Sequence, residues 1–508
     1  MMPALLLADV VARLDLAGLL VAPPAAGLDT RIDGIADDSR TVRPGDLFCA
    51  WAGVAADAHA FAGPAARAGA VAVLGERPLP DVALPQVLVR DGRRAAAVAA
   101  ALVFGNPQAA LVLVGVTGTN GKTTSVWVLR HLLATRGGAA SIGTLGAVLP
   151  DGSILPGSEA LTTPGPVQLA GTLRQLVDAG AVHLAMEVSS HALDQGRVAG
   201  LRFDAAVFTN LTRDHLDYHG TLEQYLAAKR SLVDLLRAGG VAISNADDPA
   251  WGGLAEAAPR ALTFGAAAAA DVRFSDVRLD ATGASFTLST TAGHASARIP
   301  LLGEFNVQNA TAAAAACLAL DFGLDDVAAA LGTVPQVPGR LERIASEPCP
   351  VLRDYAHTPD ALERALAALR PLTRGRLIVV FGAGGDRDRG KRPLMGRAAA
   401  GGADVAIVTS DNPRTEDPET IIDQIMTGIA EGRAIRIADR RAAIAHALEL
   451  ASPGDIVLLA GKGHEDYQIM GTQKRPFDER QVVSELLRRG READAVGELL
   501  HRGREADA

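Results

Sequence analysis

The sequence is poor in cysteine and in aromatic residues, and both shortages restrict what the chain can be. Its three cysteines, Cys49, Cys317 and Cys349, are far apart and form no C-x-x-C pair, which argues against a disulfide framework and a cysteine-based zinc site. They fit a reducing compartment, and we expect the protein to be cytoplasmic. Aromatic residues make up 4% of a chain that is 48% hydrophobic, so its core must consist mainly of Ala, Val and Leu.

The sequence also lacks an excess of basic charge and long apolar runs. Its net charge of -9 argues against nucleic acids and acidic membranes as general partners, because these require a basic face. The longest apolar stretches, near residue 95 and from Ala310, are shorter than the ~20 residues that cross a bilayer. Residues 1–20 have no basic leader and are expected to form an amphipathic helix. We therefore expect no nucleic-acid partner, signal peptide or membrane span.

The length and the apolar pattern predict an α/β chain with three domains. At 508 residues the chain exceeds what one hydrophobic core usually organises. Strand-like apolar runs alternate with helical patterns, which is typical of parallel sheets. A break at residues 104–107 and a proline-rich stretch from Thr333 place the boundaries, so the predicted domains are 1–108, 109–337 and 338–508. Strands are expected at residues 111–116, 182–188, 205–209, 240–244, 376–381, 404–409 and 455–460.

The C-terminus contains a short repeat. The sequence E-L-L-R-R-G-R-E-A-D-A from Glu485 recurs with one change from Glu498. At this length the repeat is no solenoid, and we interpret it as a duplicated helical tail on the surface.

A glycine-rich turn between a predicted strand and a predicted helix is the strongest chemical signal. Such a turn points backbone N–H groups at phosphate oxygens, while its lysine reaches the terminal phosphates and the next hydroxyl can hold Mg²⁺. Val116 stands where the general phosphate-binding loop has its first glycine, which disfavours an ordinary kinase or GTPase. The sequence therefore predicts ATP and Mg²⁺ as cofactors. The predicted ATP-binding residues of the turn are Gly118, Thr119, Asn120, Gly121, Lys122, Thr123 and Thr124.

Carboxylate and imidazole side chains follow two further predicted strands. Glu187 lies in M-E-V-S-S-H and His215 in T-N-L-T-R-D-H-L-D. Ligands bind at the carboxyl ends of parallel strands, and Mg²⁺ favours oxygen donors. Alone, Glu187 would be interpreted as a surface carboxylate, but beside the phosphate loop Thr123, Glu187 and His215 are predicted metal ligands. Lys229, in A-A-K-R, would by itself be interpreted as a solvated helix lysine.

The loop T-G-T-N-G-K-T resembles that of Mur ligases and folylpolyglutamate synthases, and a resemblance to the Mur ligase family extends over about residues 30–480. It includes L-G-E-F-N-V-Q-N ending at Asn309, P-G-R-L-E around Arg340, and D-Y-A-H-T-P from Asp354. The resemblance implies a small N-terminal UDP-binding α/β domain, a central P-loop ATPase-like domain with a parallel sheet, and a C-terminal Rossmann-like domain that binds an amino acid. It also implies that Asn309, Arg340 and Asp354 contact ATP.

The same resemblance changes the interpretation of Lys229. Its segment resembles the one in which Mur ligases carry a carbamylated lysine, N6-carboxylysine, whose added carboxylate helps to hold a second Mg²⁺. By this resemblance Lys122, Glu187, His215 and Lys229 form the catalytic set.

Three polar loops follow predicted strands of the C-terminal part: G-G-D-R-D-R-G-K-R-P from Gly384, D-N-P-R from Asp411 and G-K-G-H-E from Gly461. At one sheet edge, two arginines could bind carboxylates and Glu465 an ammonium group. Alone, D-N-P-R would be a proline turn with a solvated arginine. In the diaminopimelate-adding Mur ligases it holds the distal end of the amino acid, and lysine-adding relatives lack the arginine. The residues thus expected to bind meso-2,6-diaminopimelate are Arg387, Asp411, Asn412, Pro413, Arg414, Gly461 and Glu465.

The N-terminal part resembles the uridine-binding domain of the family in D-S-R from Asp38 and P-G-D-L-F from Pro44. Residues 53–59 differ from the usual D-G-H-containing stretch, which leaves open which groups replace the uridine contacts at residues 54–56. The residues expected to bind UDP-N-acetylmuramoyl-L-alanyl-D-glutamate are Ser39, Thr162, Thr163, Ser189, Gln195 and Arg197.

The resemblance implies a ligase of peptidoglycan synthesis that acts as a monomer. ATP would phosphorylate the D-glutamyl γ-carboxylate, and the amine of diaminopimelate would attack the acyl phosphate. The alternatives are another Mur ligase, a folylpolyglutamate-synthase-like amide ligase, a P-loop phosphotransferase and a non-catalytic nucleotide-binding module. Only the diaminopimelate-adding ligase should release ADP in a reaction that requires both the UDP-peptide and diaminopimelate, which distinguishes it from these alternatives.

Overall fold

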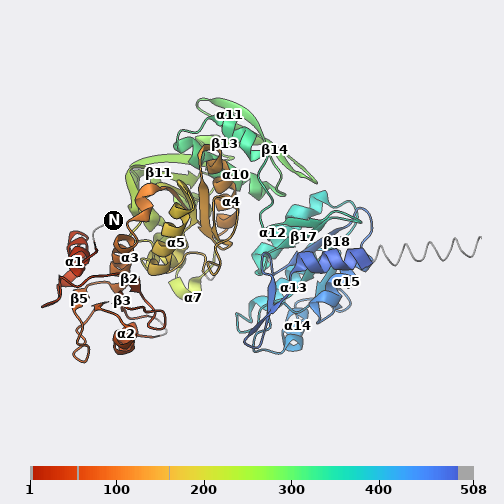
Figure 1. Cartoon of the computed structure of the whole chain (residues 1–508). Helices are drawn as coiled ribbons and strands as arrows, with labels where there is room; N and C mark the ends of the chain where they lie inside the picture. Colours follow the sequence, from red (N-terminus) through yellow and green to blue (C-terminus); the bar gives the residue numbers. More distant parts are fainter. Residues whose placement is uncertain (1–3, 54–55, 160, 490–508) are drawn as a thin grey trace, which may run out of the picture. The chain divides into compact units, whose positions relative to one another are not determined.

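The structure is a computed structural model that describes residues 4–53, 56–159 and 161–489. Strands and helices alternate along most of it, which confirms the predicted α/β class (Figure 1). Residues 54–55, whose uridine contacts the sequence leaves undetermined, lie outside the described residues. The repeated tail beyond residue 489 does so too. The chain divides into two compact units. The first comprises Met1–Asp276, Phe286–Ala297 and Gln308–Gly332, and the second comprises Val277–Ser285, Arg298–Val307 and Thr333–Ala508.

A five-stranded sheet forms the N-terminal part of the first unit. Its elements are α1 (Leu7–Leu16), β1 (Leu20–Ala22), β2 (Gly34–Ala36), β3 (Asp46–Cys49), α2 (Ala62–Ala68), β4 (Ala72–Gly75), β5 (Gln86–Val89) and α3 (Gly92–Val103). The strand order is β1-β5-β4-β3-β2; β2 to β5 are parallel to one another, and β1 is antiparallel to β5. Leu7, Val10 and Leu14 are buried on one face of α1, which explains the predicted amphipathic helix.

A ten-stranded sheet contains the strand that precedes the phosphate loop. Its strands are β6 (Val112–Thr117), β7 (Ala139–Gly143), β8 (Gly146–Val148), β9 (His183–Glu187), β10 (Phe203–Phe208), β11 (Leu236–Asn245), β12 (Arg260–Gly265), β13 (Val272–Asp280), β14 (Gly283–Thr290) and β15 (Gly293–Ile299). The order is β15-β14-β13-β12-β11-β10-β6-β9-β7-β8. Strand β6 lies between β9 and β10 and is parallel to both, so their carboxyl ends share one edge. The four strands predicted in this part are confirmed.

The helices around this sheet include one that is buried on nearly all sides. They are α4 (Lys122–Leu133), α5 (Pro166–Asp178), α6 (Ser190–Asp194), α7 (Leu216–His219), α8 (Leu222–Arg230), α9 (Leu254–Ala257), α10 (Glu304–Ala319) and α11 (Leu324–Leu331). In α10 every residue from Ala312 to Cys317 is buried. Small side chains all round a helix allow close packing on every face, which is how an alanine-rich core is built.

A six-stranded sheet forms the core of the second unit. Its elements are β16 (Glu342–Ala345), β17 (Val351–Asp354), α12 (Pro359–Leu369), β18 (Leu377–Phe381), α13 (Lys391–Gly402), β19 (Val405–Val408), α14 (Pro418–Met426), β20 (Ile435–Arg436), α15 (Arg440–Leu450) and β21 (Ile456–Ala460). The order is β16-β17-β21-β18-β19-β20, with only β16 antiparallel to its neighbour. The strands predicted at residues 376–381, 404–409 and 455–460 are confirmed.

Helices cover both faces of this sheet. Leu377, Val379 and Phe381 pack with α12, α13 and α14, whereas the alternate residues Ile378 and Val380 pack with α15. A strand that buries both faces is uniformly apolar, which explains the continuous hydrophobic runs in the sequence. The carboxyl ends of β17, β21, β18 and β19 therefore lie along one edge, where the three polar loops begin.

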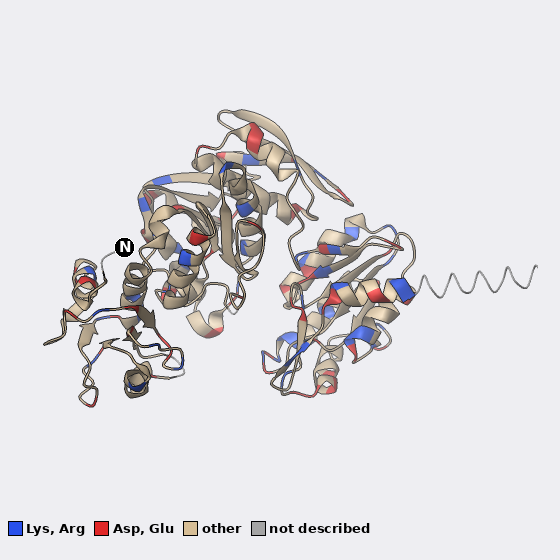
Figure 2. Ribbon diagram, in the orientation of Figure 1, with Lys and Arg blue, Asp and Glu red and all other residues tan. Residues whose placement is uncertain are grey.

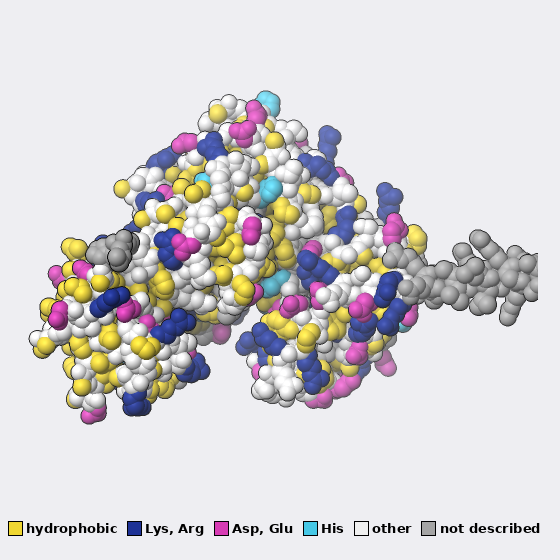
Figure 3. Space-filling view, in the orientation of Figure 1, with side chains coloured by type: hydrophobic (Ala, Val, Ile, Leu, Met, Phe, Trp, Pro, Cys, Tyr) yellow, Lys and Arg dark blue, Asp and Glu magenta, His cyan; other side chains and the backbone are white. Residues whose placement is uncertain are grey.

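On the face shown in Figure 3, acidic and basic side chains are interspersed on the surface of both units, and Figure 2 shows the same mixture of charged residues along the ribbon. Among the described residues, no helix is long and apolar enough to span a membrane. The domain bounds at residues 108 and 337 stay a prediction, since the five-stranded sheet and most of the ten-stranded sheet belong to one compact unit.

Candidate active site

The phosphate loop is held by two residues directly after β10, Thr209 and Asn210, which the sequence analysis did not single out. The Asn210 carbonyl accepts from Thr119 N at 2.8 Å, and Asn210 Oδ1 accepts from Asn120 N at 2.9 Å. Thr209 Oγ1 donates to the Asn120 carbonyl at 2.7 Å. A Cβ on Gly118 would overlap Thr209 Oγ1, so only glycine allows this close approach.

Lys122 begins helix α4, and its ammonium group lies over the loop. Nζ donates to the carbonyls of Gly118 and Thr119, both at 2.9 Å. Asn309 of α10 lies against the other end of the loop, since a Cβ on Gly121 would overlap Asn309 Oδ1. The structure therefore places Asn309 beside the loop, and its contact with ATP stays a prediction.

Lys229 is buried, which excludes the alternative of a solvated helix lysine. Only 1% of the residue is exposed, and Nζ donates to the Gly118 carbonyl at 2.7 Å. Burial, together with the nearby charge of Lys122, holds the pKa of Lys229 well below its usual range. Tyr225, one helical turn earlier, lies under Nζ with its ring centre 4.4 Å away. A neutral, nucleophilic amine is the form of lysine that reacts with carbon dioxide, so the residue fits the expected carbamate.

Glu187 ends β9 in a buried position, which excludes the alternative of a surface carboxylate. It is 1% exposed, and Val116 of β6 is its neighbour in the sheet register. Its carboxylate accepts from Thr144 N at 2.8 Å and from Thr144 Oγ1 at 3.3 Å. Among the described residues no lysine, arginine or histidine forms an ion pair with it. An unneutralised buried carboxylate at this sheet edge fits a bound cation.

Five residues expected to bind the UDP-peptide gather next to Glu187. Thr163 Oγ1 donates to the Glu187 carbonyl at 2.9 Å and accepts from Ser189 N at 3.1 Å. Arg197 donates to the Thr163 carbonyl at 2.9 Å and to Gln195 Oε1 at 2.8 Å. Thr162, the fifth, lies 3.2 Å from Thr144 through their hydroxyls.

Ser39 belongs to the turn after β2. Its neighbour Asp37 lies next to Gly165, with a carboxylate oxygen 3.8 Å from where a glycine Cβ would stand. The turn that resembles the uridine site therefore lies near the loop that carries Thr162 and Thr163.

His215 lies among aromatic rings rather than against Glu187. Its φ is 52°, a left-handed conformation, and its ring centre is 4.9 Å from that of His191 and 6.2 Å from that of Tyr225. The described contacts include none between His215 and Glu187. Burial, followed by the charge of His215, lowers the pKa of His191 to about 4.

The donor set near the phosphate loop fits Mg²⁺. Among the described residues no three His, Cys, Asp or Glu side chains form a metal-binding group. Mg²⁺ is typically held by one or two carboxylates together with substrate phosphates and water. The Thr123 hydroxyl, the Glu187 carboxylate and a carbamate on Lys229 would supply protein oxygens of this kind.

The second unit places the amino-acid loops together around a buried lysine that the sequence analysis quoted but did not assign. Lys462 is 0% exposed, and its Nζ lies 3.2 Å from Asp411 Oδ1 and 3.0 Å from Asn412 Oδ1. The other end of the Asn412 amide donates to Glu465 Oε2 at 2.8 Å. Burial raises the pKa of Asp411, but the charges of Lys462 and Arg440 outweigh it and lower that pKa. Lys462 therefore fixes which way Asn412 points.

Arg414 and Arg387 approach one another beside Gly384. A Cβ on Gly384 would lie 2.9 Å from Arg414 Nη1 and 3.7 Å from Arg387 Cγ. Pro413 precedes Arg414 and is buried, while Gly461 lies beside Asp411, whose carboxylate would be 3.2 Å from a Cβ there. All seven residues expected to bind diaminopimelate thus lie on loops at one sheet edge.

Arg340 and Asp354 also belong to the second unit. The Arg340 guanidinium stacks over the ring of Tyr355 at 4.7 Å, and Asp354 Oδ2 accepts from Leu341 N at 2.7 Å. Burial raises the pKa of Asp354, and the charge of Arg340 opposes that rise. The two expected ATP contacts therefore lie close to each other.

Comparisons with known proteins identify the family. Residues 116–317 match the Mur ligase middle domain, and residues 339–463 match the Mur ligase, glutamate ligase domain. The chain is 45% identical over 504 residues to UDP-N-acetylmuramoyl-L-alanyl-D-glutamate–2,6-diaminopimelate ligase of Gloeobacter violaceus, covering 96% of this chain and 99% of the relative. The chain belongs to the Mur ligase family. The ligase of the same name from Geobacillus kaustophilus is 47% identical over 458 residues, covering 88% of this chain and 93% of the relative.

Solved structures agree on the three-domain α/β architecture. This Mur ligase matches a structure of a UDP-N-acetylmuramoyl-L-alanyl-D-glutamate–2,6-diaminopimelate ligase with a TM-score of 0.70 and 35% identity, covering 96% of this chain and 100% of that one. A folylpolyglutamate synthase from Mycobacterium tuberculosis matches with a TM-score of 0.61 and 20% identity, covering 72% and 92% of the two chains, which shows a shared fold.

We expect Lys462→Met to destabilise this Mur ligase by about 3 kcal/mol, because it leaves the buried Asp411 carboxylate without its closest cation. Urea denaturation followed by circular dichroism measures the change. Lys474→Met is the matched control, since Lys474 is exposed on β23 (Gln473–Pro476) and should change stability little. Equal stability of the two variants would mean that Lys462 is not required to neutralise Asp411.

Proposed function

We propose that this Mur ligase uses ATP to add meso-2,6-diaminopimelate to the D-glutamyl γ-carboxylate of UDP-N-acetylmuramoyl-L-alanyl-D-glutamate, in cytoplasmic peptidoglycan synthesis. The observation that carries the proposal is the 45% identity, over almost the whole of both chains, to a ligase with this name. The loops that contain Arg414 and Glu465 support it, because they offer a cation and an anion to a zwitterionic amino acid. We further propose that the enzyme acts as a monomer, with domains 1–108, 109–337 and 338–508 binding the UDP group, ATP and the amino acid.

The phosphate loop supports ATP as the phosphoryl donor. Lys122 would neutralise the terminal phosphate as a carboxylate oxygen of the UDP-peptide attacks its phosphorus and the bond to ADP breaks. Asn309 lies beside the loop, and Arg340 and Asp354 are proposed as further ATP contacts. When bound, Mg²⁺ would lower the charge repulsion between the phosphates and the incoming carboxylate.

The second step forms the amide. The diaminopimelate amine attacks the acyl carbon, the bond from carbon to the phosphate oxygen breaks, and the amine loses its proton. Acyl phosphates are hydrolysed by water, so holding the amine in place favours transfer over hydrolysis. Glu465 would hold an ammonium group of the amino acid, and Arg387 and Arg414 its carboxylates.

The proposal is tested by measuring ADP and phosphate release with a panel of amino acids. We expect turnover only when ATP, the UDP-peptide and diaminopimelate are all present. Turnover with glutamate and a folate would instead indicate a folylpolyglutamate synthase. ATP consumption without an amine would indicate a phosphotransferase, and binding without turnover a nucleotide-binding module.

Arg414→Ala is expected to reduce diaminopimelate use far more than binding of ATP or the UDP-peptide, and the wild type should discriminate against lysine by more than about tenfold. Lysine has the same reactive amine but no distal carboxylate, so it would leave the Arg414 guanidinium without an anionic partner. Such a mismatch typically costs roughly 2 to 5 kcal/mol. The measurement is kcat/KM for both amino acids with both proteins.

Arg433→Ala provides the control for this substitution, because Arg433 is an exposed arginine of the same unit. It should leave the ratio of the two kcat/KM values unchanged. If the wild type used lysine as well as diaminopimelate, or if Arg414→Ala left their ratio unchanged, the substrate assignment would be wrong even though the ligase assignment could stand.

A further inference from the structure

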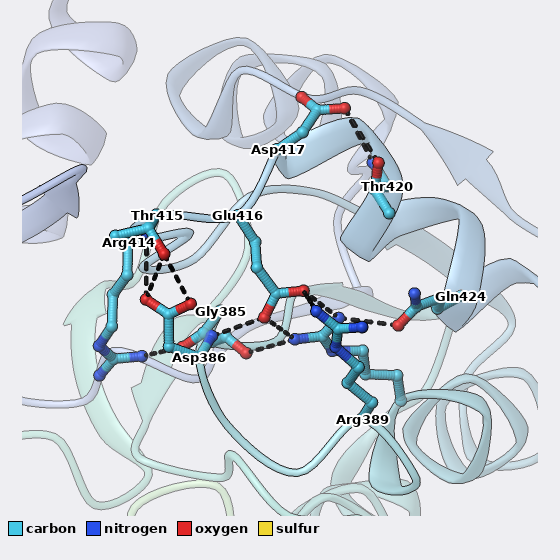
Figure 4. A network of polar contacts seen from close by, with 11 residues as sticks. Gly385, Asp386, Arg389, Arg414, Thr415, Glu416, Asp417, Thr420 and Gln424 are labelled. Atoms are coloured by element: carbon cyan, nitrogen blue, oxygen red, sulfur yellow. Dashed lines mark hydrogen bonds and ion pairs between the residues drawn. The ribbon is translucent and has the colours of Figure 1, made fainter.

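Two loops of the second unit touch beside the Arg414 side chain. The loop of residues 382–390 contacts the D-N-P-R loop through Gly385, whose N–H donates to the Asn412 carbonyl at 2.9 Å. A Cβ on Gly385 would overlap the Pro413 carbonyl, so this contact requires glycine. Figure 4 shows the polar network that surrounds the contact.

One peptide group of this loop faces two side chains at once. The Gly385 carbonyl accepts from Arg414 Nη1 at 2.7 Å, and the N–H of Asp386 donates to Glu416 Oε1 at 2.6 Å. The carbonyl of Gly385 and the N–H of Asp386 belong to the same planar trans peptide, so they point in opposite directions. Fixing the N–H toward Glu416 therefore fixes the carbonyl toward Arg414.

Glu416 is in turn held by Arg392, which is 0% exposed. The pair is bidentate, with Nη2 to Oε1 at 2.8 Å and Nη1 to Oε2 at 3.0 Å. Arg392 also donates to Gln424 Oε1 at 2.7 Å and to the Gly384 carbonyl at 3.2 Å. The hydrogen bonds from Arg392 lower the pKa of Glu416 to about 2, so Glu416 is ionised at neutral pH. Bidentate arginine–carboxylate pairs hold both side chains in one geometry.

The backbone of Arg414 is fixed independently. Its φ is 52°, its N–H donates to the Ile469 carbonyl at 3.0 Å, and its carbonyl accepts from Gly471 N at 2.7 Å. With the backbone fixed, the direction of the guanidinium depends on what its nitrogens contact. Among the described residues, the only hydrogen bond of this side chain is the one to the Gly385 carbonyl. The remaining N–H groups of a guanidinium can bind a carboxylate.

We propose that the Glu416–Arg392 pair determines specificity for the amino acid, because it orients the Gly385–Asp386 peptide that aims Arg414 at the distal carboxylate. Neither residue is assigned a contact with substrate, so both are positioning residues. The inference rests on the proposed function, since it assumes an amino acid with a second carboxylate.

The test is Glu416→Gln. A glutamine has one acceptor oxygen, so it can satisfy either the Asp386 N–H or Arg392, but its NH₂ group would oppose a donor at the other position. We expect KM for diaminopimelate to rise roughly tenfold and the preference over lysine to fall, since removing a supporting group commonly has effects of this size. KM for ATP and for the UDP-peptide should stay unchanged. Arg392→Lys, which keeps the charge but loses the bidentate pair, should act in the same direction.

A double-mutant cycle separates positioning from a general structural role. If Glu416 acts through Arg414, Glu416→Gln should have little further effect on diaminopimelate KM once Arg414→Ala is present. Additive effects of the two substitutions would overturn the inference, as would an unchanged preference over lysine in both Glu416→Gln and Arg392→Lys.

Asp404→Asn is the matched control. Asp404 Oδ2 accepts from Arg370 Nη1 at 2.7 Å and from Leu377 N at 2.8 Å, so it likewise joins one arginine and one backbone N–H, but at the amino end of β18. It should leave the amino-acid preference unchanged, and a fall equal to that of Glu416→Gln would overturn the inference. A wild type that does not use diaminopimelate would refute the proposed function and this inference together. If the wild type prefers diaminopimelate and the Glu416→Gln and Arg392→Lys variants keep the same preference over lysine, only the inference is refuted.

Discussion

Lys122→Ala is expected to abolish turnover while binding of the UDP-peptide survives. Lys122 is the first residue of α4, and its Nζ donates to the carbonyls of Gly118 and Thr119. This is where a terminal phosphate would be bound. Its removal takes a cation away from the group on which negative charge develops during transfer. A loss of about 4 kcal/mol in transition-state stabilisation, roughly a thousandfold in rate, is the expected size.

The rate is measured as ADP release at saturating substrates, and UDP-peptide binding is measured by calorimetry without ATP. Lys474→Ala, a lysine replacement at an exposed position of the other unit, should keep wild-type activity. Near-normal turnover of a folded Lys122→Ala protein would remove the phosphate loop from the mechanism. Loss of UDP-peptide binding would instead indicate that the substitution disturbs the fold.

The sequence predicts the parallel strands and the loops after them to within a few residues. The run predicted as a strand at residues 376–381, for example, is β18 (Leu377–Phe381). These strands bury both faces, so their apolar pattern is continuous and ends where the chain reaches polar surface. The phosphate loop could be predicted because its chemistry is local: glycines, lysine and threonine act within one turn.

The buried charges could not be predicted, because several of their partners come from distant parts of the chain. Lys229 Nζ donates to the Gly118 carbonyl, 111 positions earlier, and Lys462 Nζ donates to Asn412 Oδ1, 50 positions earlier. Lys462 also has near partners, since its Nζ lies 3.6 Å from Glu465 Oε2 and donates to the Tyr467 carbonyl at 2.7 Å. A lysine and a glutamate three positions apart are usually both exposed, so this spacing alone does not predict burial. Arg392 is a similar case, since Glu416 and Gln424 lie on a different loop and helix. Only the resemblance to a family pointed to Lys229, and it gave no role to Lys462 or Arg392.

Replacement of Lys229 is the second substitution expected to reduce activity strongly, and the surroundings of its side chain explain why. A buried ammonium group is costly, and here it also lies near the charge of Lys122. A carbamate would change the side chain from a cation to an anion. This would turn the repulsion from Lys122 into attraction and supply oxygen atoms for Mg²⁺.

Lys229→Ala is therefore expected to reduce kcat by at least about a hundredfold, because the variant lacks the amine on which a carbamate forms. Added bicarbonate should not restore activity, whereas acetate or formate should restore part of it by placing a carboxylate in the space left by the side chain. Arg230→Ala is the control: it removes the adjacent cation, which donates to the Gly252 carbonyl, and should have little effect. Rescue by bicarbonate, or an unmodified Lys229 in a high-resolution structure of the active enzyme with Mg²⁺ bound, would contradict the carbamate. A short acid acts only if the lost element is a carboxylate, so rescue by acetate but not by methylamine would distinguish a missing anion from a missing lysine.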